Sequence, residues 1–224
     1  MLKIIGLNGS PRGSQSRTRQ LIEQVLNYTR SNGAETEFYD IAKLDVKPCI
    51  ACDRCHKIGS CFQKDDYQRI IDGILSADGI VIGSPVYNYQ VTAQLKTWLD
   101  RLGMIIHCQM FSGKYGVVVT TSGGAGETET ADYLDFAVRR TGAQCVGRLV
   151  SGIENDGLLE KGSPLFDEAN KLGRQLMDAI KEKKVFPRQI EEQEQLKGFF
   201  AYMIGQRKEK WEWEYNYWQQ KGWL

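Results

Sequence analysis

The sequence predicts an α/β fold in which a five-stranded parallel sheet is covered by helices on both faces. The first observation is that short apolar runs alternate five times with segments whose apolar residues recur at helical spacing. Such an alternation needs crossover helices, which cover both faces of a parallel sheet. The second observation is the composition, because 224 residues with 42% hydrophobic and 25% charged residues are typical of one large globular domain.

Each predicted strand is a short apolar run bounded by turn residues. The strands are residues 3–8, 36–41, 79–83, 115–121 and 144–150. Each predicted helix places apolar residues on one face, and the helices are residues 17–28, 67–76, 91–106, 128–140 and 164–183. Asn32-Gly33 is typical of a left-handed helix end, and Asp65 or Asp66 is a candidate cap for the second helix.

The chain changes character at about Lys184, where charged and aromatic residues mix without clear strands. The last fourteen residues hold four of the five tryptophans, which are Trp211, Trp213, Trp218 and Trp223. We therefore divide the chain into a sheet domain, residues 1–183, and a helical aromatic tail, residues 184–224. Aromatic residues suit both a core and an interface, so the tail packs either on its own domain or against another subunit. We expect a homodimer or a homotetramer.

The loop after the first strand is rich in glycine and hydroxyl groups and leads into a helix N-terminus. Its candidate phosphate-binding side chains are Ser10, Arg12, Ser14, Ser16, Arg17 and Thr18. Free backbone N–H groups and the helix dipole suit a phosphate at such a place. The sequence has neither the P-loop pattern nor G-x-G-x-x-G, so this loop favours one terminal phosphate over a pyrophosphate.

Two further loops follow the third and fourth strands. The first offers an aromatic surface and contains Pro85, Val86, Tyr87, Asn88 and Tyr89. The second allows a ligand to approach the backbone closely and contains Thr121, Ser122, Gly123 and Gly124. Because ligands bind where parallel strands end, the three loops together predict a site for a phosphorylated planar heterocycle.

Four cysteines lie within thirteen residues in the pattern C-x2-C-x2-C-x5-C, and they are Cys49, Cys52, Cys55 and Cys61. We expect residues 48–62 to form a loop, with His56 as a solvated member of it. The spacing favours a [4Fe-4S] cluster, which is held by thiolates on a C-x2-C-x2-C core. Zinc, a redox-active dithiol or an empty loop remain alternatives. Cys108 and Cys145 are expected to be buried apolar residues.

The ordered set of motifs resembles the NADPH-dependent FMN reductases of the flavodoxin-like flavoproteins over nearly all of residues 1–183. These motifs are Gly9-Ser10-Pro11-Arg12, Gly83-Ser84-Pro85-Val86-Tyr87, and Leu95-Lys96 followed by Asp100-Arg101. The resemblance implies a sheet of order 2-1-3-4-5 and non-covalent FMN. It places the phosphate on Ser10, Arg12, Ser16, Arg17 and Thr18. It places the ribityl chain and ring along residues 85–89, with the polar edge of the ring at residues 121–124.

The cysteine spacing resembles that of the iron–sulfur flavoproteins, which share this fold and carry a compact cysteine motif at the same position. The resemblance implies an FMN-dependent oxidoreductase with NAD(P)H as donor and a small molecule or a protein as acceptor. The main alternative is an electron carrier without its own substrate. A zinc or redox-thiol flavoprotein, or a non-catalytic flavin- or metal-binding interaction protein, is a further alternative. No side chain is assigned a catalytic role, since flavin chemistry does not demand a carboxylate pair or a Ser/His/Asp set.

Charge and hydropathy limit the partners. The formal charge is +1, from 29 Lys+Arg and 28 Asp+Glu, and it argues against nucleic acid. No apolar run approaches the ~18–20 residues that cross a bilayer, and the N-terminus lacks the pattern of a signal peptide. We therefore expect a cytoplasmic protein without a membrane partner, in which the thiols stay reduced.

Overall fold

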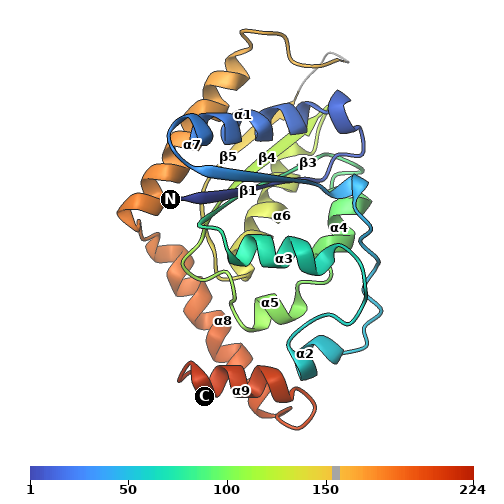
Figure 1. The fold of residues 1–224 in the computed structure, drawn as a ribbon, viewed down its shortest axis with the longest axis vertical. Coiled ribbons are helices and arrows are strands. Elements are labelled where there is room, and N and C mark those ends of the chain that lie inside the picture. The colour runs from blue at the N-terminus through green and yellow to red at the C-terminus, as the bar shows by residue number, and fades with distance from the viewer. Residues whose placement is uncertain (153–156) are drawn as a thin grey trace.

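The fold is built on a five-stranded parallel sheet of order β2-β1-β3-β4-β5, which confirms the predicted order (Figure 1). The computed structural model describes residues 1–152 and 157–224. The strands are β1 (Lys3–Asn8), β2 (Glu35–Asp40), β3 (Gly79–Pro85), β4 (Tyr115–Ser122) and β5 (Gln144–Gly152). Because every strand runs in the same direction, the loops after β1, β3 and β4 meet at one edge of the sheet.

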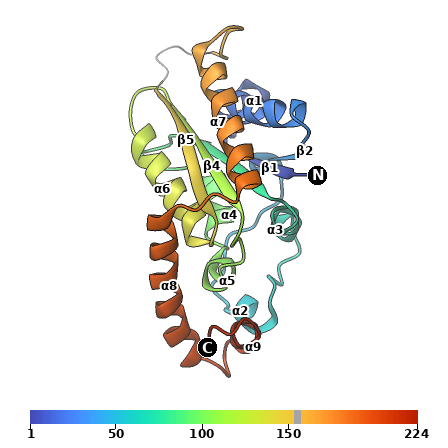
Figure 2. The same ribbon diagram turned by 90° about the vertical axis from the view of Figure 1, so that its left-hand side faces the viewer.

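Helices cover both faces of the sheet (Figures 1 and 2). One face carries α1 (Arg17–Ser31) and α7 (Pro164–Glu182), and the other carries α3 (Tyr67–Leu75), α4 (Ala93–Leu99) and α6 (Glu127–Arg140). Successive strand residues point to opposite faces. Ile4 and Val81 therefore pack against α1 and α7, whereas Ile5 and Ile80 pack in the core of the other face.

The helix predicted for residues 91–106 is wrong in one respect, because the structure divides it into α4 and α5 (Gly103–His107). The break lies at Arg101. The i→i+4 hydrogen bonds of the helix give way there to i→i+3 bonds, from the Arg101 N–H to the Trp98 carbonyl and from the Leu102 N–H to the Leu99 carbonyl, both at 3.1 Å. The Arg101 carbonyl also accepts a hydrogen bond of 2.7 Å from the Tyr67 hydroxyl. At this interruption the Arg101 side chain contacts the segment that carries the cysteines, at Cys61.

The segment 48–62 is also not entirely a loop, because it contains the short helix α2 (Arg54–Ile58). Residues in the left-handed region flank this helix, with φ of 57° at Asp53 and 79° at Gly59. Two 3-10 turns lie earlier in the chain, at Gly13–Gln15 after β1 and at Ile41–Lys43 after β2. Of the two predicted caps of α3, Asp66 stands at the N-cap position but makes no side-chain cap hydrogen bond, whereas the Asp65 carboxylate before it accepts a hydrogen bond of 3.2 Å from the Tyr67 N–H.

After α7 the chain continues as α8 (Pro187–Gly205) and α9 (Glu212–Gln220). Helix α8 begins at the free edge of β5, where the Gln189 amide donates to and accepts from the backbone of Cys145, at 2.8 and 2.7 Å. Figure 2 shows α8 running past α6 to the far end of the molecule, where α9 lies beside α2. Trp211 and Trp218 are buried there with Cys108, Phe200 and other apolar residues. The tail thus buries much of its aromatic surface against its own chain.

Candidate functional site

The loop after β1 is held by hydrogen bonds to its neighbours. The Gly9 N–H donates to the Gly83 carbonyl at 2.8 Å, and the Asn8 side chain accepts from the Ser10 N–H at 3.2 Å. Ser16 caps α1 by accepting from the Arg19 N–H at 3.1 Å. These contacts leave Ser10, Ser16 and Thr18 buried side by side with the start of α1, where free N–H groups favour an anion.

The loop after β3 forms a tight turn. The backbones of Tyr87 and Gln90 exchange hydrogen bonds of 2.8 and 3.1 Å across Asn88 and Tyr89. Both central residues have positive φ, 51° and 59°, which is typical of a type I′ turn and costly for residues with side chains. Such strain persists only where the surroundings impose it. The turn presents Tyr87 and Tyr89 as exposed aromatic rings, 45% and 61% exposed.

The loop after β4 joins the other two. The Thr121 carbonyl accepts from the Val86 N–H at 2.8 Å, and the Thr121 hydroxyl lies 2.8 Å from the Thr18 hydroxyl. The space around Gly123 and Gly124 is open, since a side-chain carbon added at either residue would have no heavy atom within 4 Å. A ligand can therefore approach the backbone of this loop closely.

The three loops enclose one cavity of about 110 Å³. Its lining residues are Ser10, Arg12, Ser16, Arg17, Thr18, Pro85, Val86, Tyr87, Thr121, Ser122 and Gly123. Of the residues predicted to hold a cofactor, Asn88, Tyr89 and Gly124 do not line the cavity. Ser14, one of the candidate hydroxyls of the first loop, is exposed outside it. The cavity thus combines buried hydroxyls with two guanidinium groups at the sheet edge.

The four cysteines lie away from this cavity, in the segment that precedes α3. Cys49 and Cys52 are exposed, Cys55 and Cys61 are half-buried, and all four are free thiols. Their sulfurs do not form a group compact enough to share one ion, among the residues that the structure describes. Cys108 and Cys145 are buried, as predicted.

A buried guanidinium supports Cys61. Arg101 donates to the Cys61 Sγ at 3.0 Å and to the Lys47 carbonyl at 3.1 Å, and it forms an ion pair with Asp65. It also lies over the Tyr67 ring, 4.1 Å from the centroid. Burial alone would raise the pKa of Asp65, but hydrogen bonds from Arg101 and from two backbone N–H groups outweigh it and lower that pKa.

A second buried network contains both histidines of the chain. Glu214 of α9 accepts from the Nδ1 of His56 at 2.5 Å and from the Nδ1 of His107 at 3.1 Å. Glu214 has no exposed surface, and His56 is buried rather than solvated, so the prediction for His56 was wrong. Burial alone would lower the pKa of His56, but hydrogen bonds to Cys55 and Glu214 outweigh it and raise that pKa to about 10.

This network is a set of hydrogen bonds and not an ion site. The ligand atoms of His56, His107 and Glu214 lie within 4.8 Å of one another. However, the two imidazole rings stack 4.9 Å apart at an angle of 20°. The nitrogen lone pair lies in the ring plane, so two nearly parallel rings cannot both direct lone pairs at one ion. Each ring instead donates to its own oxygen of Glu214.

A family model for NADPH-dependent FMN reductases matches residues 2–156. The chain belongs to this family. An iron–sulfur flavoprotein of Archaeoglobus fulgidus is 28% identical over the full length of both chains. An iron–sulfur flavoprotein of Methanocaldococcus jannaschii is 34% identical over 61% of this chain and 71% of its own. These relatives confirm the resemblance that the cysteine spacing indicated.

Solved structures agree with the fold of this FMN reductase family member. An apo NADH:FMN oxidoreductase has a TM-score of 0.56 at 18% identity and covers 79% of this chain and 88% of its own. A flavodoxin from the domain Archaea has a TM-score of 0.54 at 16% identity and covers 80% of this chain and 99% of its own. The protein is a flavin-dependent oxidoreductase by family. Within the described residues, no helix has the length and apolarity needed to cross a membrane.

The donor chemistry of the cavity fits FMN. Buried hydroxyls of Ser10, Ser16 and Thr18, with guanidinium groups beside them, are donors for a terminal phosphate. The donor chemistry of the cysteine segment fits an iron–sulfur cluster, since it offers four unbridged thiols and one N–H donor to sulfur.

Sequence reasoning missed Arg101 as a partner of Cys61, and it missed His107 and Glu214 entirely. Arg101 belongs to a recognised motif but sits 40 positions from Cys61, and Glu214 sits 158 positions from His56. No local spacing in the sequence indicates either pairing.

Proposed function

We propose that the protein oxidises NAD(P)H by means of FMN bound at the sheet edge, and that Cys49, Cys52, Cys55 and Cys61 hold a [4Fe-4S] cluster. The observation that carries the proposal is the buried guanidinium of Arg101, which donates to the Cys61 sulfur within a segment of four free thiols. An N–H donor aimed at sulfur stabilises negative charge there, as iron–sulfur centres require. Family membership supports the flavin part of the proposal.

Each of the three loops has its own role in binding FMN. Ser10, Arg12, Ser16, Arg17 and Thr18 bind the FMN phosphate. Residues 85–89 support the ribityl chain and the ring, and residues 121–124 offer backbone N–H groups to its polar edge. When bound, FMN accepts a hydride and can release electrons singly, and a cluster supplies a one-electron carrier. The chain then joins a two-electron donor to a one-electron acceptor, which is a small molecule or a protein.

The sequence spacing of the cysteines supports a cluster over zinc. A [4Fe-4S] cluster is held on a C-x2-C-x2-C core, as in Cys49, Cys52 and Cys55. Zinc usually takes two separated C-x2-C pairs instead. The iron–sulfur names of the relatives support the same choice.

Steady-state turnover tests the enzymatic part of the proposal. The FMN-loaded protein is mixed with NADH or NADPH and a quinone or a dye as acceptor. We expect catalytic turnover with at least one nicotinamide donor. Reduction limited to one equivalent per bound flavin would instead identify an electron carrier without a substrate site.

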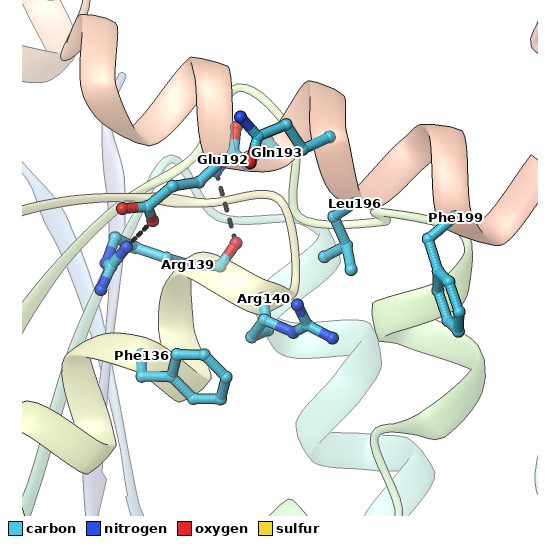
Figure 3. Close-up of a pocket in the computed structure, with 8 residues that line it drawn as sticks. Phe136, Arg139, Arg140, Glu192, Gln193, Leu196 and Phe199 are labelled. Atoms are coloured by element: carbon cyan, nitrogen blue, oxygen red, sulfur yellow. Dashed lines mark hydrogen bonds and ion pairs between the residues drawn. The ribbon is translucent and has the colours of Figure 1, made fainter.

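The proposal includes a homodimer or homotetramer. A groove of about 560 Å³ lies between α6 and α8, and Figure 3 shows the aromatic rings of Phe136 and Phe199 on its walls. These rings are 50% and 58% exposed. Arg139 and Glu192 form an ion pair on one side of the groove. An exposed apolar surface of this kind is typical of a subunit contact. Light scattering measures whether the molecular mass of the particle in solution is lower for Phe199→Ser than for the wild type.

A cytoplasmic location is also part of the proposal. Cys49 and Cys52 are exposed free thiols, and such thiols persist in a reducing compartment.

A further inference from the structure

The tail helix α9 contacts the cysteine segment at several points, all between Cys52 and Cys61. Lys210, just before α9, forms an ion pair of 2.7 Å with Asp53. The Trp211 ring stacks on the His56 ring at 4.5 Å. The Trp213 ring lies so close to Gly59 that a side-chain carbon at residue 59 would meet it at 2.2 Å. The backbone around Cys55 is therefore held along its whole length by residues from the end of the chain.

Glu214 is the centre of these contacts. It is fully buried and accepts hydrogen bonds from His56 of α2 and from His107 of α5. A buried carboxylate that loses its donors strongly destabilises the fold, so these hydrogen bonds fix α9, α2 and α5 relative to one another. His56 directly follows Cys55 in α2, which makes the position of Cys55 depend on Glu214.

Helix α2 has little stability of its own. It contains 5 residues, and no side chain caps its N-terminus. Isolated helices shorter than ~12 residues are marginal in water, and left-handed residues such as Asp53 add a conformational cost. The conformation of α2 must therefore come from its packing. Arg101 holds the segment at Cys61 by its hydrogen bond to the Cys61 sulfur. Helix α9 holds the segment at Cys55 through the hydrogen bond between Glu214 and His56.

We propose that α9 is a latch that holds the cysteine segment in a fixed conformation, with Glu214 as its positioning residue. The latch deepens the proposed function, because it makes retention of the [4Fe-4S] cluster depend on the C-terminal helix. The proposal also gives the aromatic tail a role inside its own chain. Glu214 does not line the cavity at the sheet edge, and it acts on Cys55 through its hydrogen bond to His56.

The first test uses iron-free, reduced protein and therefore does not depend on a cluster. The variant Glu214→Gln removes the charge that binds both histidines, and Glu212→Gln is a matched control on the exposed side of α9. The alkylation rate of each cysteine is measured by peptide mass spectrometry, with exposed Cys52 as internal reference. We expect Glu214→Gln to raise the relative rate of Cys55 at least tenfold and Glu212→Gln to leave it within twofold. An unchanged Cys55 rate in Glu214→Gln overturns the latch.

The second test uses reconstituted protein. Iron release to a chelator should be at least tenfold faster from Glu214→Gln than from the wild type and from Glu212→Gln. Equal release rates overturn the latch as a device for cluster retention. If wild-type protein takes up no iron, the proposed cluster is wrong, and the alkylation comparison still decides the latch.

Retention of FMN shows that each variant is folded, because the flavin cavity lies at the sheet edge, away from α9. If Glu214→Gln loses FMN, then Trp213→Leu replaces it, since Trp213 is partly exposed and contacts Gly59 directly. The same rise in Cys55 alkylation is expected for this variant, and its absence overturns the proposal.

Discussion

At the residue scale, Ser10 shows how one hydroxyl can decide between ligands. Its side chain is 1% exposed and lines the cavity beside Arg12 and Thr18. We predict that Ser10→Asp weakens FMN binding by more than tenfold, which corresponds to ~1.4 kcal/mol, because the new carboxylate repels the phosphate. Riboflavin, which lacks the phosphate, should be much less affected. Ser14→Asp in the same loop is the control, since Ser14 is exposed outside the cavity. Equal FMN affinity in Ser10→Asp and wild type would show that the phosphate does not bind at this loop.

Arg101 is the residue that ties the sheet domain to the cysteine segment. Its pair with Asp65 is almost fully buried, with 2% and 0% of the two side chains exposed. Removal of one partner of a buried pair costs about 3–5 kcal/mol, so Arg101→Met should lower the free energy of unfolding by that amount. Urea unfolding of iron-free protein measures it. Lys96→Met, which breaks an exposed pair with Asp100, should cost below about 1 kcal/mol, and equal losses in the two variants would contradict the account.

The same pair predicts a pH dependence. The pKa of Asp65 is lower in the folded protein than in the unfolded chain, where it is about 3.9. The ionised carboxylate therefore stabilises the fold above about pH 4, and this stabilisation is lost as the pH falls through the folded-state pKa. We expect the difference in unfolding free energy between wild type and Asp65→Asn to shrink below about pH 4. A difference that stays constant from pH 7 to pH 3 would show that Asp65 does not titrate in this way.

At the element scale, the turn after β3 depends on the start of α6. Gly126 has a φ of 90°, and a side-chain carbon there would lie 2.9 Å from the Tyr89 ring. We predict that Gly126→Ala displaces the turn and weakens FMN binding at least tenfold. Gly113→Ala is a control, because Gly113 also has a positive φ, 82°, but no neighbour within 4 Å. Flavin fluorescence titration measures the FMN affinity of both variants. Identical affinities in Gly126→Ala and Gly113→Ala would show that the turn does not contribute to FMN binding.

The elements also show what a sequence can predict. The strands and the three loops after them follow from apolar runs and turn residues that are adjacent in the chain, and the structure brings those loops together. Between α4 and α5, the Arg101 carbonyl accepts a hydrogen bond from the Tyr67 hydroxyl, which lies 34 positions away. The burial of His56 depends on Glu214, which lies 158 positions away. Periodicity contains no signal for such pairings, because each is set by tertiary packing.

At the scale of the whole molecule, two candidate sites lie in different parts of one chain. One is the cavity lined by the loops after β1, β3 and β4. The other is the cysteine segment, whose helix α2 lies beside α9 (Figure 1). The tail passes along the β5 edge and returns to α2, so it connects the sheet to the cysteines. The central claim is that both sites bind redox groups in the same molecule.

One measurement tests this claim most directly, and it compares the iron, sulfide and FMN content of anaerobically reconstituted wild type and Cys52→Ala. We predict about four irons and four sulfides per wild-type chain, together with a [4Fe-4S] EPR signal after reduction. Cys52→Ala should lose the cluster and keep FMN, because the phosphate loop is elsewhere in the fold. Stoichiometric zinc, or four free thiols without iron in the wild type, would contradict the account.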